Sequence, residues 1–191
     1  MKNARIFIDV QNDLIDGTLK NNVAISIMPK MIKYAEALKK VITTSTDINE
    51  VILCTQDTHK KTVEILSGKI GYIQTLEAQK KINEHCILGT YGWLLDKHLY
   101  NVINGYCTLL QKDTYAYKYW DDYLNDCDTI TICGLYTDTS VLANAVMIRT
   151  IYPDKKITVI SDLCAGTSPG KHKEALSVMD SLLIDIERIS S

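Results

Sequence analysis

Five short runs of β-branched and apolar residues are spread along the chain, and they constrain its fold more than any other feature. Each run is continuous rather than alternating, which is typical of strands buried on both faces. Between the runs, apolar residues recur at three- and four-residue spacing, as in amphipathic helices. This alternation predicts right-handed crossovers and a parallel sheet covered by helices on both faces. The runs cover residues 4–10, 50–56, 107–112, 128–135 and 155–162.

The predicted helices cover residues 26–42, 93–103, 117–127, 140–151 and 171–183. Residues 182–189 either continue the last helix or form a sixth strand at the edge of the sheet. The segment 58–91 shows no clear periodicity, and a loop of that length in a compact domain is usually functional. Single domains commonly reach ~200 residues, so we expect one α/β domain over residues 1–191.

The composition excludes several classes of partner. Acidic residues number 23 and basic residues 21, which argues against binding to nucleic acid or to an anionic membrane. The six cysteines lie mostly in apolar runs, as expected of buried, reduced thiols rather than a disulfide framework. The first residues do not form a signal peptide, and no apolar run approaches the ~20 residues of a membrane span. We therefore expect a cytoplasmic protein.

Charged residues end several of the predicted strands, where parallel sheets bind their ligands. Asp9 ends the first run, Lys112 the third and Asp162 the fifth. A buried carboxylate is costly unless it is paired, so Asp9 and Lys112 form either a structural ion pair or part of a catalytic site. In the second case, a nucleophile between them would complete a triad for attack on a carbonyl group.

A possible metal site follows the second run. Asp57 and His59 are two residues apart in a predicted turn, and His85 comes from the far end of the irregular segment. One carboxylate and two imidazoles are a suitable ligand set for Zn²⁺ or Fe²⁺, with positions left open for water.

Ser140 follows the fourth run, in the stretch "CGLYTDTSVLANA". A serine at a helix N-terminus caps free amide groups and contributes about 1 kcal/mol. Alternatively, a nucleophile there lies beside amide groups that can receive an oxyanion. Serine normally needs a base such as histidine, whereas cysteine needs only a modest lowering of its pKa. The nearest base at a strand end is Asp9, so the site is better suited to a thiol.

Five blocks of sequence together resemble the isochorismatase-like cysteine hydrolases, which include the nicotinamidases. The resemblance implies a doubly wound six-stranded parallel sheet of order 3-2-1-4-5-6 with helices on both faces. It also implies hydrolysis of a small amide at a non-peptide C–N bond, and a homo-oligomer, either a dimer or a tetramer. The blocks are "IDVQNDLIDG", "TQDTHKKT", "EHCILGTYGW", "LLQKDTY" and "CGLYTDTSVLANA", in this order.

The resemblance assigns roles to individual residues. It implies that Asp9 and Lys112 are catalytic, and that Ser140 stands where the family has its nucleophilic cysteine. The family pattern is roughly G-x-x-T-D-x-C-V, and this chain has G-L-Y-T-D-T-S-V. The peptide Leu135–Tyr136 corresponds to a position that is usually cis, and the amides of Tyr136 and Ser140 correspond to the oxyanion hole.

The resemblance further implies that Asp57, His59 and His85 bind a divalent metal such as Zn²⁺, Fe²⁺ or Mn²⁺, and that no organic cofactor is needed. Three interpretations of Ser140 remain open. The chain is an inactivated Cys→Ser variant of a hydrolase, a natural relative that binds a small ligand without hydrolysis, or an enzyme whose serine is the nucleophile.

The substrate is expected to be a nicotinamide-like or ureide-like amide. Nicotinamidases clamp their pyridine ring between aromatic residues, but the corresponding positions here are the aliphatic Leu14 and Ile82. With these two residues, we place Trp93 and Tyr115 in the predicted substrate pocket. An aspartyl-phosphate phosphatase is disfavoured, because that chemistry expects a second carboxylate at position 11, which is Gln11.

Overall fold

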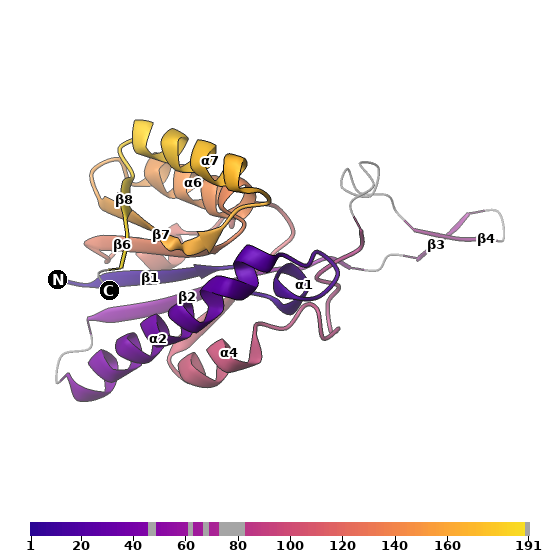
Figure 1. Ribbon diagram of the computed structural model, residues 1–191, viewed down its shortest axis with the longest axis horizontal. Coiled ribbons are helices and arrows are strands. Elements are labelled where there is room, and N and C mark those ends of the chain that lie inside the picture. The colour runs from indigo at the N-terminus through magenta and orange to yellow at the C-terminus, as the bar shows by residue number, and fades with distance from the viewer. Residues whose placement is uncertain (46–48, 61–62, 67–68, 73–82, 190–191) are drawn as a thin grey trace.

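Six parallel strands form the central sheet of the protein, a computed structural model of which describes residues 1–45, 49–60, 63–66, 69–72 and 83–189. The strand order is β5-β2-β1-β6-β7-β8 (Figure 1). Numbered along the chain among themselves, the six strands have the order 3-2-1-4-5-6, so the predicted topology is confirmed. The strands are β1 (Asn3–Ile8), β2 (Glu50–Asp57), β5 (Cys107–Lys112), β6 (Thr129–Leu135), β7 (Lys156–Ala165) and β8 (Asp185–Glu187).

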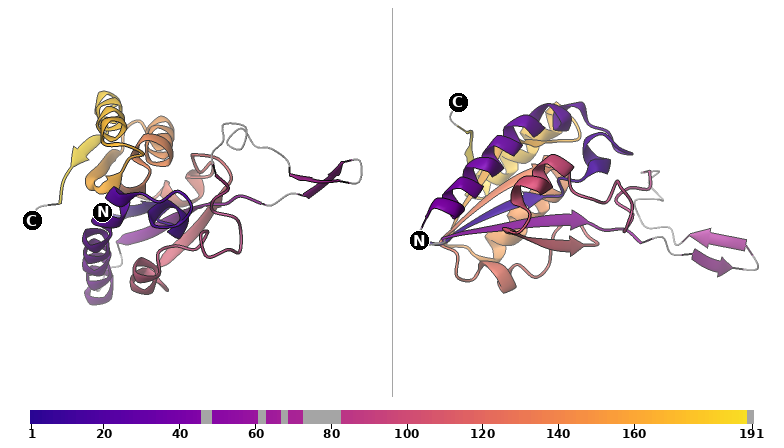
Figure 2. Two further views of the ribbon diagram at one scale, coloured as in Figure 1. Left: turned by 45° about the vertical axis from the view of Figure 1, so that its right-hand side comes forward. Right: turned by 90° about the horizontal axis from the view of Figure 1, so that it is seen from below.

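Helices cover both faces of the sheet. The helices α2 and α4 pack together on one face, and α6 and α7 lie on the opposite face (Figures 1 and 2). A short π-helical turn, η1, leads from β6 into α6. The helical elements are α1 (Asn12–Ile15), α2 (Asn22–Thr44), α4 (Lys97–Ile103), α5 (Asp121–Leu124), η1 (Thr137–Val141), α6 (Leu142–Ile151) and α7 (Pro169–Ser181).

The structure differs from the predicted elements at several points. The helix predicted over 93–103 begins only at Lys97, because the Asp96 carboxylate caps it by accepting the Leu99 N–H. The helix predicted over 117–127 is reduced to the four residues of α5. Residues 182–189 supply the edge strand β8 rather than more helix. The irregular segment contains the antiparallel pair β3 (Val63–Leu66) and β4 (Lys69–Tyr72), which projects from the body (Figure 1).

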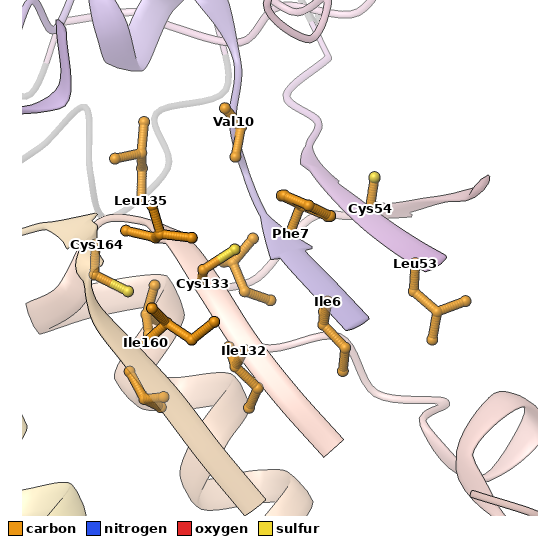
Figure 3. Packing of buried hydrophobic residues seen from close by; sticks show 14 of the residues in the cluster. Ile6, Phe7, Val10, Leu53, Cys54, Ile132, Cys133, Leu135, Ile160 and Cys164 are labelled. Carbon is orange, nitrogen blue, oxygen red and sulfur yellow. The ribbon is translucent and has the colours of Figure 1, made fainter. Parts of the chain in front are cut away.

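The core lies on the sheet, where Phe7, Cys54 and Cys133 of adjacent strands are buried side by side (Figure 3). All six cysteines are free thiols, as the sequence predicts. Within the described residues, no helix is both long enough and apolar enough to span a membrane.

Gly134 allows β6 to pass close to the end of β1. Its φ is +129°, and a Cβ atom at this position would lie 2.1 Å from the carbonyl oxygen of Ile8. A side chain is therefore excluded here both by backbone conformation and by space. This close approach brings the turn after β6 next to Asp9.

Candidate active site

Four strand ends bring their polar side chains together at one edge of the sheet. Asp9 directly follows β1, Asp57 and Lys112 end β2 and β5, and Ser140 lies in η1 after β6. The Lys112 Nζ is 2.6 Å from Asp9 Oδ2, 3.5 Å from Ser140 Oγ and 3.7 Å from Asp57 Oδ1. The lysine therefore lies at the centre of the cluster, in contact with three groups that are distant in sequence.

Asp9 is held in an unusual backbone conformation with φ of +47°. Left-handed conformations are uncommon for residues other than glycine and are often found at active sites. The hydroxyl group of Thr55 fixes the residue twice: it accepts the Asp9 N–H at 3.1 Å and donates to Asp9 Oδ1 at 2.6 Å. Sequence reasoning missed Thr55, whose position inside an apolar strand gave no signal of this contact.

The charges of Asp9 and Lys112 depend on one another. Burial raises the pKa of the Asp9 carboxyl, and the nearby Lys112 ammonium opposes this rise only in part. Burial alone would lower the pKa of Lys112, but the carboxylates of Asp9 and Asp57 outweigh it and the pKa is raised. The site thus combines a lysine that keeps its charge with a carboxylate that is a stronger base than usual.

Asp57, His59 and His85 form a compact group whose potential ligand atoms all lie within 4.8 Å of one another. The Nε2 atoms of His59 and His85 are 2.9 and 3.4 Å from the same oxygen, Asp57 Oδ2. His85 Nδ1 is 2.8 Å from the carbonyl oxygen of Asn83, which directs Nε2 toward the group. This donor set and its orientation fit a divalent metal such as Zn²⁺.

The ionisation of Asp57 also suits a cation. Burial would raise its pKa, but hydrogen bonds with His59 and His85 and the charge of Lys112 outweigh that effect and lower it. Backbone pairing brings His85 into place, because His59 pairs with the residues that follow His85. The His59 N–H donates to the Cys86 carbonyl oxygen, and the Leu88 N–H donates to the His59 carbonyl oxygen.

Asp13 fixes the segment that carries His85. Its Oδ2 accepts the Cys86 N–H at 2.7 Å, and its Oδ1 accepts the Thr18 N–H at 3.1 Å. A Cβ atom at Gly92 would lie 2.0 Å from the same carboxylate, so the chain is packed directly against it. Sequence reasoning missed this residue, although a carboxylate within the block "IDVQNDLIDG" was an available signal.

A cavity of about 520 Å³ opens onto the cluster, with Ser140, Asp57 and His85 in its lining. Of the residues predicted to bind substrate, Leu14 and Tyr115 line this cavity. Trp93 is not in the described lining, because its indole N–H points to Thr58 Oγ1 at 2.9 Å. Ile82 lies outside the described residues.

Residues 3–188 match the family model of the isochorismatase domain. The chain belongs to the isochorismatase family. Comparison with curated proteins gives no match.

Solved structures of nicotinamidases and pyrazinamidases share the fold. The nicotinamidase/pyrazinamidase from Bacillus subtilis is 21% identical, with 98% of this chain and 100% of that chain covered and a TM-score of 0.76. The pyrazinamidase/nicotinamidase from Streptococcus mutans is 24% identical, with coverage of 97% and 99% and a TM-score of 0.73. The pyrazinamidase from Pyrococcus horikoshii, solved in complex with zinc, is 19% identical, with coverage of 99% and 100% and a TM-score of 0.72.

The turn that carries Ser140 in this isochorismatase-family chain is fixed on both sides. The Leu135–Tyr136 peptide is cis, as the resemblance implied. Within η1, the Asp138 carboxylate accepts the Thr167 N–H at 2.7 Å, and the Thr137 hydroxyl lies 2.8 Å from His172 Nδ1. His172, on α7, thus contacts the turn that carries Ser140.

Proposed function

We propose that the site is built to hydrolyse the C–N bond of a small amide, with residue 140 as nucleophile. The observation that carries this proposal is the position of Lys112, whose Nζ lies within 3.5 Å of both Asp9 Oδ2 and Ser140 Oγ. Ser140, Asp57 and His85 line a cavity, through which a small ligand can reach the cluster. The structural likeness to nicotinamidases supports the same reaction class.

Asp9 takes the proton of the nucleophile as the nucleophile attacks the amide carbon. The amide groups of Tyr136 and residue 140 receive the developing oxyanion, and Lys112 stabilises negative charge nearby. Asp9 then returns the proton to the leaving nitrogen, and ammonia or an amine departs. Water, with Asp9 again as base, releases the acid and restores the nucleophile.

Asp57, His59 and His85 would hold a divalent metal beside this centre, and Zn²⁺, Fe²⁺ or Mn²⁺ are the proposed ions. When bound, such an ion polarises a coordinated oxygen or nitrogen of the substrate or a water molecule. The substrate proposed is a nicotinamide-like or ureide-like amide, and a homodimer or homotetramer remains a prediction from the resemblance.

With serine at position 140, we propose that the first step is slow, as in an inactivated Cys→Ser variant. The second candidate is a protein that binds a small amide without turnover, which the same serine favours. Both candidates place a small amide in the cavity. They differ in whether the Ser140→Cys protein would hydrolyse that amide.

The test is ammonia release from a panel that includes nicotinamide, pyrazinamide and ureides, with zinc supplied. We expect Ser140→Cys to raise the rate on the preferred amide by roughly 10²-fold or more, because a thiol is within reach of a carboxylate base. Adding Asp9→Asn to that variant should remove the gain. Equal, substantial rates with serine and cysteine would contradict the need for a thiol. Amide binding by both proteins without turnover would establish the binding role instead.

A further inference from the structure

Asn144, on α6, has a fully buried side chain whose amide group makes four hydrogen bonds. Its Nδ2 donates to the carbonyl oxygens of Ser140 at 2.7 Å and Tyr115 at 3.0 Å. Its Oδ1 accepts the backbone N–H of Tyr117 at 2.8 Å and the indole N–H of Trp120 at 3.2 Å. Both donors and both acceptor positions are in use, so the amide has one orientation that satisfies all four partners.

These bonds join two segments that meet at the candidate active site. Ser140 belongs to the turn after β6, whereas Tyr115 and Tyr117 belong to the segment that follows Lys112. Ser140 and Tyr115 line the same cavity. A single buried side chain therefore fixes the spacing between the nucleophile position and one wall of the cavity.

The contact with Ser140 is made to the peptide of the residue itself. Residues 137–141 form a π-helical turn, a rare geometry that is frequent at functional sites. Asn144 follows Ser140 by four residues, and its side chain supplies a donor to the Ser140 carbonyl. This bond restrains the orientation of residue 140 relative to Lys112, whose Nζ is 3.5 Å from Ser140 Oγ.

We infer that Asn144 is a positioning residue for the reaction proposed above: it holds residue 140 at its working distance from Lys112 and from the Tyr115 wall. The inference rests on the proposed function, because it assumes that residue 140 is the nucleophile position. If Asn144 only joined α6 to the neighbouring loop, variants of Asn144 would lose activity only as far as they lose folding stability. The two roles can be separated by experiment.

The probe is iodoacetamide, a small amide that alkylates a thiol at position 140 in the Ser140→Cys protein. The sulfur displaces iodide, and the thiol proton passes to the buffer. Peptide mass analysis follows alkylation at position 140 across pH, and the Ser140 chain gives the background from the native thiols. We expect Asn144→Ala in this protein to lower the rate at pH 7 at least tenfold and to move the rate–pH profile to higher pH.

The matched control is Ile148, which is fully buried one turn further along α6 and is not among the four partners. Of Ile148→Val and Ile148→Ala, the control is the one whose urea unfolding midpoint equals that of Asn144→Ala. Its alkylation rate should stay within twofold of the rate of the Ser140→Cys parent. Equal losses in both proteins would overturn the inference. Asn144→Thr, which keeps a hydroxyl donor, should retain at least five times the Asn144→Ala rate, and no such rescue would also contradict it.

Should Asn144→Ala not fold, Asn144→Asp takes its place, since it keeps the shape but loses the donors to Ser140 and Tyr115. It should show the same loss relative to its matched Ile148 variant, and an unchanged rate would overturn the inference. The alkylation readout needs no substrate. If Ser140→Cys hydrolyses no amide, the proposed function fails, while the Asn144 comparison is still decided by thiol reactivity.

Discussion

Replacing Lys112 by methionine would leave the Asp9 carboxyl group buried without its cation. The two side chains are 2% and 0% exposed, so water cannot replace the lost charge without rearrangement of the site. Removing one partner of a buried ion pair typically costs about 3–5 kcal/mol. Because Asp9 keeps its hydrogen bond from Thr55, we expect a loss near the lower limit, about 3 kcal/mol at pH 7 to 8.

The loss should depend on pH in a defined direction. Without the ammonium group, burial raises the pKa of Asp9 further above its unfolded value, so the folded variant takes up a proton that the unfolded chain does not. The penalty is therefore largest above both pKa values and shrinks as the pH falls through the raised pKa of Asp9. Asp9→Asn/Lys112→Met removes the buried Asp9 charge together with its cation and should recover most of the lost stability.

Urea unfolding followed by the fluorescence of Trp93 and Trp120 measures these differences at pH 5, 6, 7 and 8. Lys112→Met and the double variant are compared with the parent chain in the presence of a chelator. A loss below about 1 kcal/mol that does not change with pH would refute the reasoning, since it would mean that Lys112 does not compensate a buried charge. A double variant no more stable than Lys112→Met would refute it as well.

Three further substitutions test the site and its support. Gly134→Ala should cost more than about 3 kcal/mol in urea unfolding, because its Cβ would lie 2.1 Å from the Ile8 carbonyl oxygen. Asp13→Asn should weaken zinc binding about tenfold in competition with a chromogenic chelator, because it perturbs the acceptor of the Cys86 N–H beside His85, a proposed metal ligand. His85→Ala should reduce bound zinc, measured by elemental analysis, because one of three grouped ligands is lost.

Each of these substitutions has a matched control. Gly89→Ala has a positive φ of 82° but no atoms within 4 Å of the added carbon, so it should cost only about 1–2 kcal/mol. Asp16→Asn and His98→Ala alter exposed residues and should leave zinc binding unchanged. If a test substitution and its control changed stability or zinc binding equally, the contact named for the test residue would not be the cause of the change.

The sequence predicts the convergence of Asp9, Lys112 and Ser140 because parallel strands place their carboxyl ends at one edge of the sheet. Residues whose contacts depend on tertiary packing were beyond such reasoning. Thr55 gains its contact from an adjacent strand, and Asn144 gains its contacts from a segment that only tertiary structure brings near. Local sequence patterns predict helices, strands and their ends. The contacts of Thr55 and Asn144 depend instead on how the chain arranges these elements in space.

Two predictions illustrate the same limit. Asp162 was expected to end a strand beside the site, but β7 continues to Ala165, and the carboxylate pairs with Lys30 and accepts the Ile189 N–H. Trp93 was placed in the substrate pocket because it is one of the aromatic residues nearest to the ring-clamping positions, which are aliphatic in this chain. Its indole instead donates to Thr58, since the direction of a side chain in a loop is set by hydrogen bonds that spacing does not reveal.

The groups around Ser140 are expected to allow an amide to bind without being hydrolysed. Within the described residues, the hydrogen-bond partner of Ser140 Oγ is Lys112, and two carboxylates keep that lysine protonated, so it cannot accept the hydroxyl proton. The base beside it is Asp9, whose carboxylate is strengthened by burial but is still far weaker than an alkoxide. Such a base can remove the proton of a thiol, whose ordinary pKa is about 8.5, but it cannot remove the proton of an alcohol. An amide complex of the Ser140 chain should therefore persist where the Ser140→Cys protein converts it.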